Sequence, residues 1–97
     1  MLFEWDENKE KANIIKHGID FETASRVFDD ELRYEEYDYL HSINEDRLIT
    51  IGEVNGKLML LFVSFTERGD AIRIISARKA NKADRRKYYD HQKRNRF

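Results

Sequence analysis

The middle of the chain contains the pattern that most restricts its fold. Residues 58–66 are almost all apolar, which is typical of a central strand covered on both faces. Asn55 and Gly56 come shortly before them and favour the positive φ angles of a tight hairpin turn. Residues 68–70 supply a second turn around a glycine. We therefore expect three consecutive strands, joined by these two turns, over residues 47–54, 58–66 and 71–77.

The start of the chain predicts one strand and one helix. Residues 2–5 are mostly apolar and have the length of a short strand. Asp6 can accept hydrogen bonds from the first amide groups of a helix that follows it. This helix is expected to run to His17, to turn Ile15 inward and to end at Gly18 in a left-handed cap.

A second helix and an acidic segment are expected next. Asp20 is the predicted N-cap of this helix, whose apolar residues recur at helical spacing until Asp29 and Asp30 end it. Residues 31–46 are acidic and rich in tyrosine. They predict a weak edge strand followed by a mobile loop.

The last helix and the order of the elements define the expected fold class. Asn81 and Asp84 have the spacing of a capping box, so a helix is expected to begin there and to continue to Phe97, with residues 91–97 as a fraying basic tail. Runs of helices and strands, without strict alternation, predict an α+β domain. We expect a single domain over residues 1–97, with an N-terminal strand and two helices, an antiparallel meander sheet of three to four strands, and a C-terminal helix.

Charge is distributed unevenly along the chain, although the net charge is only −1. Residues 1–46 contain 14 acidic and 5 basic residues, residues 47–77 contain 3 and 4, and residues 78–97 contain 2 and 9. The basic end can therefore attract a polyanion such as a nucleic acid. A charged helix that serves only solubility is the competing interpretation.

The composition excludes or disfavours several classes of protein. The absence of cysteine excludes disulfides and zinc–thiolate sites. The longest apolar run, residues 58–63, is too short to span a bilayer, and residues 1–10 lack the apolar stretch of a signal peptide. We therefore expect no membrane association and a cytoplasmic location. The three histidines lack ligand spacing and no glycine-rich phosphate loop is present, which predicts neither a metal site nor a nucleotide cofactor.

Basic residues around the third expected strand are the strongest candidates for a functional site. They are Arg68, Arg73, Arg78 and Lys79. Arg73 lies in a segment that otherwise looks buried, where an arginine is costly unless it is paired or lines an open site. The structural alternative for Arg73 is an ion pair with Glu4 or Glu53. Cationic side chains at the end of a strand are suited to binding phosphate.

Three further residues have both a functional and a structural interpretation. His17 can titrate near neutral pH, but a histidine at a helix C-terminus is also favourable for structural reasons alone. Glu67 can act as a base or can neutralise a neighbouring arginine, and we favour the structural role. Tyr88 can stack on a base or pack in the core.

Motifs in both halves of the chain form a pattern typical of one protein family. The first half contains FEWDENK at 3–9, Asn13, KHG at 16–18, FE at 21–22, Ala24 and VFD at 27–29; the second half contains Arg47, Gly52, TER at 66–68, RIISARKA at 73–80, and Arg85, Arg86 and Tyr88. Through these motifs, which extend over residues 3–89, the chain resembles the BrnT toxin family.

The resemblance implies a fold, an activity and a partner. The fold would be similar to that of RelE-type toxins, and the activity would be a ribonuclease that inhibits translation, on free RNA or on the ribosome. The partner would be an antitoxin similar to BrnA, which typically carries a ribbon–helix–helix region that binds operator DNA. The toxin would then contact DNA only through this antitoxin.

The resemblance also implies a reaction without metal or cofactor, in which the ribose 2′-hydroxyl attacks the neighbouring phosphate. At the matching positions, Arg68, Arg73 and Arg78 would stabilise the charge that develops on the phosphate. His17 or Glu67 would transfer a proton. The residues expected to bind RNA are Lys79, Arg85, Arg86 and Tyr88.

Two other functions fit the same residues. The chain could be a non-catalytic module that docks a DNA-binding antitoxin for autorepression of an operon, or a plain RNA- or DNA-binding domain that uses its basic tail. The acidic first half suits a basic partner segment, and residues 33–39 could accept an added strand from a partner.

Overall fold

The computed structural model describes residues 1–56 and 59–95, which form one α+β unit. The elements are β1 (Leu2–Glu4), α1 (Glu7–His17), α2 (Phe21–Ser25), the 3₁₀ turn η1 (Arg26–Asp29), β2 (Tyr34–Tyr37), β3 (Leu48–Val54), β4 (Met59–Arg68), β5 (Ala71–Lys79) and α3 (Lys82–Arg94). The predicted start of a strand at Leu58 and the predicted end of the last helix at Phe97 lie outside the described residues.

The five strands form one mixed sheet in the order β1-β5-β4-β3-β2. The neighbours from β2 to β5 pair antiparallel, whereas β1 pairs parallel to β5. The prediction of a purely antiparallel sheet with three to four strands is therefore wrong. A parallel neighbour far away in the sequence needs no tight turn, so it leaves no local signal in the sequence.

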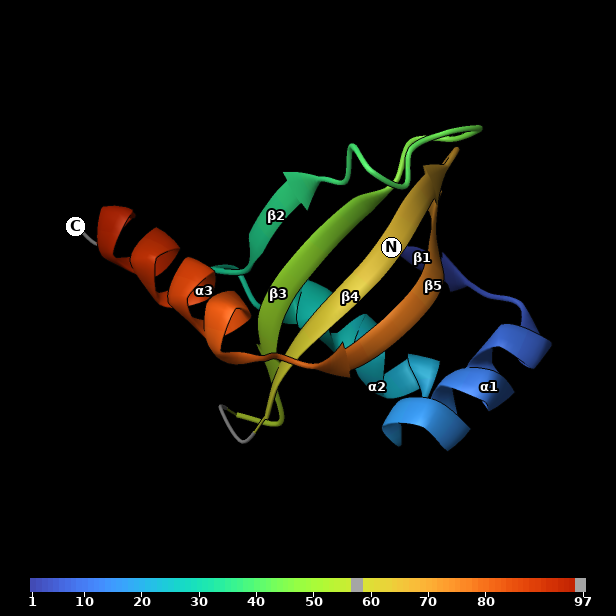
Figure 1. Cartoon of the computed structure of the whole chain (residues 1–97), viewed down its shortest axis with the longest axis horizontal. Helices are drawn as coiled ribbons and strands as arrows, with labels where there is room; N and C mark the ends of the chain where they lie inside the picture. The colour runs from blue at the N-terminus through green and yellow to red at the C-terminus, as the bar shows by residue number, and fades with distance from the viewer. Residues whose placement is uncertain (57–58, 96–97) are drawn as a thin grey trace.

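The two faces of the sheet are covered differently. Figure 1 shows α2 behind the sheet, α1 beside β5 and α3 to one side, next to β2 and β3. The larger apolar core lies between the sheet and the α2–η1 segment, and a smaller core lies under α3, around Tyr88, Ile51 and Leu60. In the described part of the chain, no helix covers the β4–β5 half of the second face (Figure 1). We call this half the open face.

The predicted helix caps are confirmed. The Asp6 side chain accepts hydrogen bonds from the amides of Asn8 and Lys9, and Gly18 adopts a left-handed conformation with φ of 71°. The hydrogen bond from the Lys9 amide is the main reason why the pKa of Asp6 is below its usual value. At the start of α3, Asn81 and Asp84 form the expected capping box.

A β-bulge interrupts the pairing of β4 with β5. Phe65 pairs with Ile74 and Ser64 pairs with Ser76, so β5 contains one extra residue, Ile75. A bulge of this kind reverses the alternation of side chains beyond it. Ala77 therefore lies in the same core as Ile74, and the prediction that Ala77 shares a face with Arg73 is wrong.

Helix α1 is held to the sheet by an amide, not by an apolar side chain. Asn13 is buried and its Nδ2 donates to the carbonyls of Ala77 at 2.8 Å and Ile19 at 2.9 Å, while its Oδ1 accepts from the Ala77 amide at 3.1 Å. Ile15, which was expected to face inward, is 88 % exposed. Because β1 ends at Glu4, the edge of β5 beyond it needs a polar partner, and Asn13 supplies it.

At the opposite edge of the sheet, a side chain also bonds to backbone groups that lack a strand partner. β2 pairs with β3 only as far as Ile51, and beyond it the Glu53 amide donates to Asp30 Oδ2 at 2.9 Å. Gly52 lies between these positions, where η1 approaches β3 closely. A Cβ atom at Gly52 would lie 2.7 Å from Val27 Cγ1, so only glycine fits without a shift of the backbone or side chain.

The docking of α1 can be tested by substitution. We expect Asn13→Ala to lower the free energy of unfolding by on the order of 3 kcal/mol, because it leaves the Ala77 amide and two carbonyls without partners. Ile15→Ala on the same helix is the matched control and should change it by less than about 0.5 kcal/mol. Denaturant unfolding followed by circular dichroism measures both. A larger loss for Ile15→Ala would contradict this account of α1.

Candidate functional site

The bulge brings two arginines to the open face. Arg73 pairs with Thr66, and Arg78 pairs with Phe62, and directly opposed residues in an antiparallel pair share a face. Four residue steps separate Thr66 from Phe62, so the two arginines lie about 13 Å apart along the strands. Ser76 and Ser64 lie opposite each other between them. We call the six residues the β4–β5 row: Phe62, Ser64, Thr66, Arg73, Ser76 and Arg78.

Arg78 is held in place at the junction of β5 and α3. Its guanidinium carbon lies 3.9 Å from the centroid of the Phe62 ring, and its Nη1 donates to Asp84 Oδ2 at 2.6 Å. The same carboxylate oxygen accepts the Asn81 amide in the capping box. All the hydrogen bonds that Arg78 makes within the described chain come from Nη1. Its Nε and Nη2 are therefore available to a phosphate.

Arg73 has a weaker partner. Its Nη1 lies 4.0 Å from Glu4 Oε2, across the β1–β5 pair. The ion pair between Arg73 and Glu4, which the sequence analysis gave as the structural alternative, is thus present, although the two atoms are at the distance limit of an ion pair. Because Glu4 is 43 % exposed in its side chain, this pair contributes little to stability. An anion on the open face can compete for the Arg73 guanidinium.

The remaining predicted catalytic residues lie in three different places. Arg68 is two positions after Thr66 on β4 and therefore lies on the same, open side of the strand. Its Nη2 lies 3.4 Å from Glu45 Oε2. Glu67 is exposed and pairs with Ile72, so it points to the other side. His17 ends α1, which packs along the free edge of β5. The structure therefore brings the three arginines to one face and separates His17 and Glu67 from them.

The predicted RNA-binding residues also divide into two groups. Lys79, Arg85 and Arg86 are exposed at the end of β5 and on α3, and the first two line a shallow hollow together with Leu60. Tyr88 is fully buried in the smaller core, and its hydroxyl donates to Asp30 Oδ2 at 2.6 Å. Burial, followed by this hydrogen bond, raises the pKa of the Tyr88 hydroxyl well above its usual value.

The loop between β2 and β3 adds residues that the sequence analysis did not select. A hollow on the open side has Ile49 and Phe62 in its lining, together with His41 from the loop and Lys87 from α3. A second hollow, lined by His41 and Arg47, lies within the loop itself. The loop is acidic and has no periodic pattern, so nothing local in the sequence predicted that it would reach the sheet.

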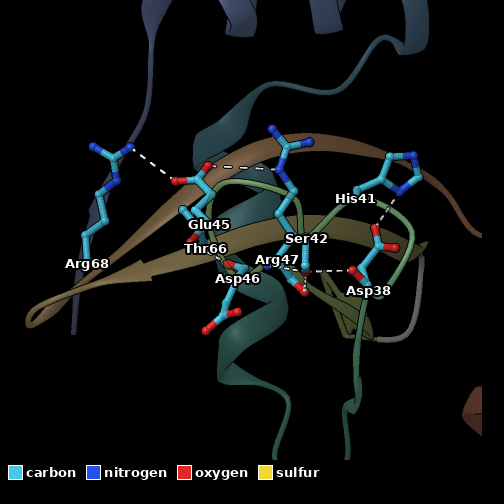
Figure 2. Close-up of polar contacts among 8 residues, drawn as sticks. All are labelled: Asp38, His41, Ser42, Glu45, Asp46, Arg47, Thr66 and Arg68. Carbon is cyan, nitrogen blue, oxygen red and sulfur yellow. Dashed lines mark hydrogen bonds and ion pairs between the residues drawn. The ribbon is translucent and has the colours of Figure 1, made fainter.

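Hydrogen bonds tie this loop to the sheet (Figure 2). The Ser42 hydroxyl donates to the Asp38 carbonyl at 2.6 Å and accepts from the Arg47 amide at 2.8 Å. The Thr66 hydroxyl of the β4–β5 row donates to the Asp46 carbonyl at 2.7 Å. The segment expected to be a mobile loop is therefore anchored at both of its ends.

Comparison with known proteins identifies the family. A family model described as "Ribonuclease toxin, BrnT, of type II toxin-antitoxin system" matches residues 5–84, which is most of the chain. The chain belongs to the BrnT family. No curated protein matches it. The resemblance inferred from the sequence motifs is thus confirmed, while the likeness to RelE-type folds remains a prediction.

The sequence of this BrnT-family chain disfavoured both a metal site and a membrane-spanning helix. Among residues 1–56 and 59–95, no three His, Asp or Glu side chains gather as they would around a metal ion. Within the same residues, no helix has the length and apolar character needed to cross a membrane.

Because Tyr88 is fully buried, we expect it to have a structural role that can be separated from RNA binding. We expect Tyr88→Phe to lower the free energy of unfolding by about 1–2 kcal/mol, because it removes the hydrogen bond to Asp30 and keeps the packing of the ring. RNA cleavage per folded molecule should stay unchanged, because the ring has no exposed surface. Thermal unfolding and a cleavage assay check the two parts. A loss of cleavage in a fully folded variant would return Tyr88 to the site.

Proposed function

We propose that this BrnT-family protein is an endoribonuclease whose substrate lies on the open face of the sheet, along the β4–β5 row. The observation that carries the proposal is the bulge at Ile75, which aligns Arg73 and Arg78 on the face that the helices leave uncovered. Two guanidinium groups on one face, with the partly exposed Ser76 between them, suit a phosphodiester backbone.

In the proposed reaction, the ribose 2′-hydroxyl attacks the adjacent phosphate and the 5′-oxygen leaves, which produces a cyclic phosphate and a free 5′-hydroxyl. Arg78 is positioned by Phe62 and Asp84 before substrate arrives, so it can stabilise the developing negative charge without reorganising. Arg73 acts on the same charge from the other end of the row. These cations take the place of a metal ion in the proposal.

The remaining cations would bind the RNA on either side of the reacting phosphate. Arg68 lies beyond Arg73 at the β4–β5 turn, where it is exposed. Beyond Arg78 lie the exposed cations of the β5–α3 junction: Lys79, Arg85 and Arg86. Phosphate contacts of this kind position a strand without reading its sequence.

A toxin of a type II toxin–antitoxin system has an antitoxin partner. We propose that this partner is similar to BrnA and connects the toxin to operator DNA. The acidic β2 strand lies at the edge of the sheet, where one side of its backbone is free to accept an added strand. Arg78 lies on β5, which β4 and β3 separate from β2 in the sheet, so a substitution of Arg78 leaves the β2 edge intact and antitoxin binding can be tested separately from cleavage.

The proposal predicts the effect of removing either arginine. Arg73→Ala and Arg78→Ala should each lower the rate of RNA cleavage by about 100-fold or more, because each removes a charge-stabilising donor. Arg26→Ala on η1 is the matched control, since Arg26 is exposed in the layer behind the sheet. The measurement is incubation of purified, antitoxin-free protein with bulk RNA, followed by a denaturing gel.

All three variants should remain folded and should still bind the antitoxin in a pull-down. Full cleavage by both Arg73→Ala and Arg78→Ala would show that the site lies elsewhere. Intact RNA with the folded wild-type protein, in the presence and absence of translating ribosomes, would favour the non-catalytic docking module.

The proposed chemistry also predicts a dependence on the substrate. An oligonucleotide with 2′-deoxyribose at every position should bind but stay intact, because it lacks the attacking hydroxyl. EDTA should leave the cleavage of the matching RNA unchanged, since no metal ion enters the proposed step. Mass spectrometry of the products should detect a 2′,3′-cyclic phosphate. Cleavage of the deoxy substrate, or a loss of activity in EDTA that Mg²⁺ restores, would contradict the mechanism.

A further inference from the structure

RNA cleavage also requires a group that takes the proton of the attacking hydroxyl, and the arginines of the open face do not provide one. Arg73 and Arg78 cannot supply it, because arginine stays protonated in proteins. Of the two candidates from the sequence, Glu67 points to the other side of the sheet, and His17 ends α1, which packs along the free edge of β5.

We propose that His41, oriented by Asp38, is this proton acceptor, and that its imidazole contacts the ribose of the substrate. The assignment rests on the proposed ribonuclease function and adds a catalytic residue to the same site. It depends on the geometry of the β2–β3 loop, which Figure 2 shows together with the residues that hold it.

The orientation of the imidazole is fixed by a carboxylate. His41 Nδ1 lies 2.8 Å from Asp38 Oδ2. When Nδ1–H donates to this oxygen, the other ring nitrogen, Nε2, is left as the acceptor. The His41 side chain is 63 % exposed and the Asp38 side chain only 18 %, so the carboxylate is the anchored partner and the imidazole faces the substrate side. A base oriented by a third group is the usual arrangement in catalysis by histidine.

Hydrogen bonds hold the backbone around this pair in place. The Asp38 amide donates to the Arg47 carbonyl at 2.9 Å, and the Ser42 hydroxyl joins the Asp38 carbonyl to the Arg47 amide. On the far side of the loop, the Tyr37 hydroxyl donates to Asp46 Oδ1 at 2.6 Å. These contacts connect the loop to β2 and β3, so His41 has a defined position relative to the sheet.

His41 is connected to the β4–β5 row through the hollow that it lines. Phe62 lies in the lining of this hollow and also carries the Arg78 guanidinium on its ring. A phosphate bound by Arg78 would therefore lie next to Phe62, whose ring also lines the hollow of His41, and in the proposal its flanking ribose enters this hollow. Neither of the other histidines has this relation to an arginine: His17 ends α1, which packs along the free edge of β5, and His91 of α3 packs its ring against Tyr34 of β2.

Charged groups of both signs surround the imidazole. Within the lining of its two hollows the anions besides Asp38 are Glu36 and Glu45, and the cations are Lys87 and Arg47. Lys87 Nζ lies 2.7 Å from Glu36 Oε1, and this hydrogen bond raises the pKa of Lys87, which keeps the lysine charged. Tyr37 and Tyr39 complete the ionisable groups there.

Arg47 is a second cation beside His41 with an unused donor. Its Nε is buried and has no hydrogen-bond partner within the described chain, and the nearest carboxylate oxygen, Glu45 Oε1, is 4.0 Å away. Both side chains line the hollow within the loop (Figure 2). A cation beside the base favours the approach of the phosphate backbone to it.

The proposed step moves one proton and exchanges one phosphorus–oxygen bond for another. Neutral His41 Nε2 takes the proton of the 2′-hydroxyl while the 2′-oxygen forms a bond to phosphorus and the bond from phosphorus to the 5′-oxygen breaks. The leaving 5′-oxygen takes a proton from solvent water, and the imidazolium returns its proton to solvent afterwards. No oxidant or reductant is needed.

Substitution of His41, measured over a range of pH, tests the assignment. In bulk-RNA cleavage, His41→Gln should lower the rate roughly 10²–10⁴-fold at neutral pH. The wild-type rate should rise with pH as the base loses its proton, and this rise should disappear in His41→Gln. In His41→Ala, added imidazole should restore part of the rate, a result that a purely structural role would not give.

Matched variants separate this assignment from the proposed function. His91→Gln should retain the wild-type rate and pH profile. Asp38→Asn should keep the pH-dependent rise but lower the rate, because Asp38 positions His41 and does not contact the substrate. Near-wild-type cleavage by His41→Gln, in a preparation where Arg78→Ala is inactive, would overturn the role of His41 and leave the proposed function intact. A folded wild-type protein that cleaves no RNA would overturn both.

Discussion

One inserted residue, Ile75, determines how the rest of this protein is organised. Arg73 and Arg78 are five positions apart, so in a regular strand they would point to opposite faces. The bulge shifts the phase by one residue, and both arginines reach the open face while Ala77 joins the core on the other. The same shift thus completes the core under the helices and assembles the cationic row. Without it, either the core or the row would lose its continuity.

The short edge strands create a second constraint that two side chains resolve. β1 and β2 each cover only part of the neighbouring strand, which leaves backbone groups of β5 and β3 without a strand partner. Asn13 bonds to the free edge of β5, and Asp30 bonds to that of β3. These polar contacts attach α1 to the edge of β5 and η1 to the edge of β3, and the hydrogen bond from Tyr88 to Asp30 attaches α3. The helices are thereby kept away from the open face.

Each arginine around the open face has an acidic partner that holds it without neutralising it completely. Asp84 orients Arg78, Glu4 lies near Arg73, and Glu45 lies between Arg68 and Arg47. Most of these pairs are long and partly exposed, so they are weak in water and a phosphate can compete with them. The acidic character of the first half of the chain therefore has a specific consequence in the fold. It supplies carboxylates that position cations from the second half.

The sequence alone determined the elements that depend on local chemistry, and the tertiary structure decided which side chains meet. The caps at Asp6, Gly18 and Asn81 were predictable because capping involves residues within one helical turn. The motif at residues 73–80, together with KHG at 16–18 and the other motifs over residues 3–89, indicated the BrnT family, and the motifs of the second half selected the arginines. The parallel pairing of β1, the phase of β5 beyond Ile75 and the position of His41 were not predictable. Each depends on a contact between segments distant in the sequence, and such contacts leave no periodic signal along the chain.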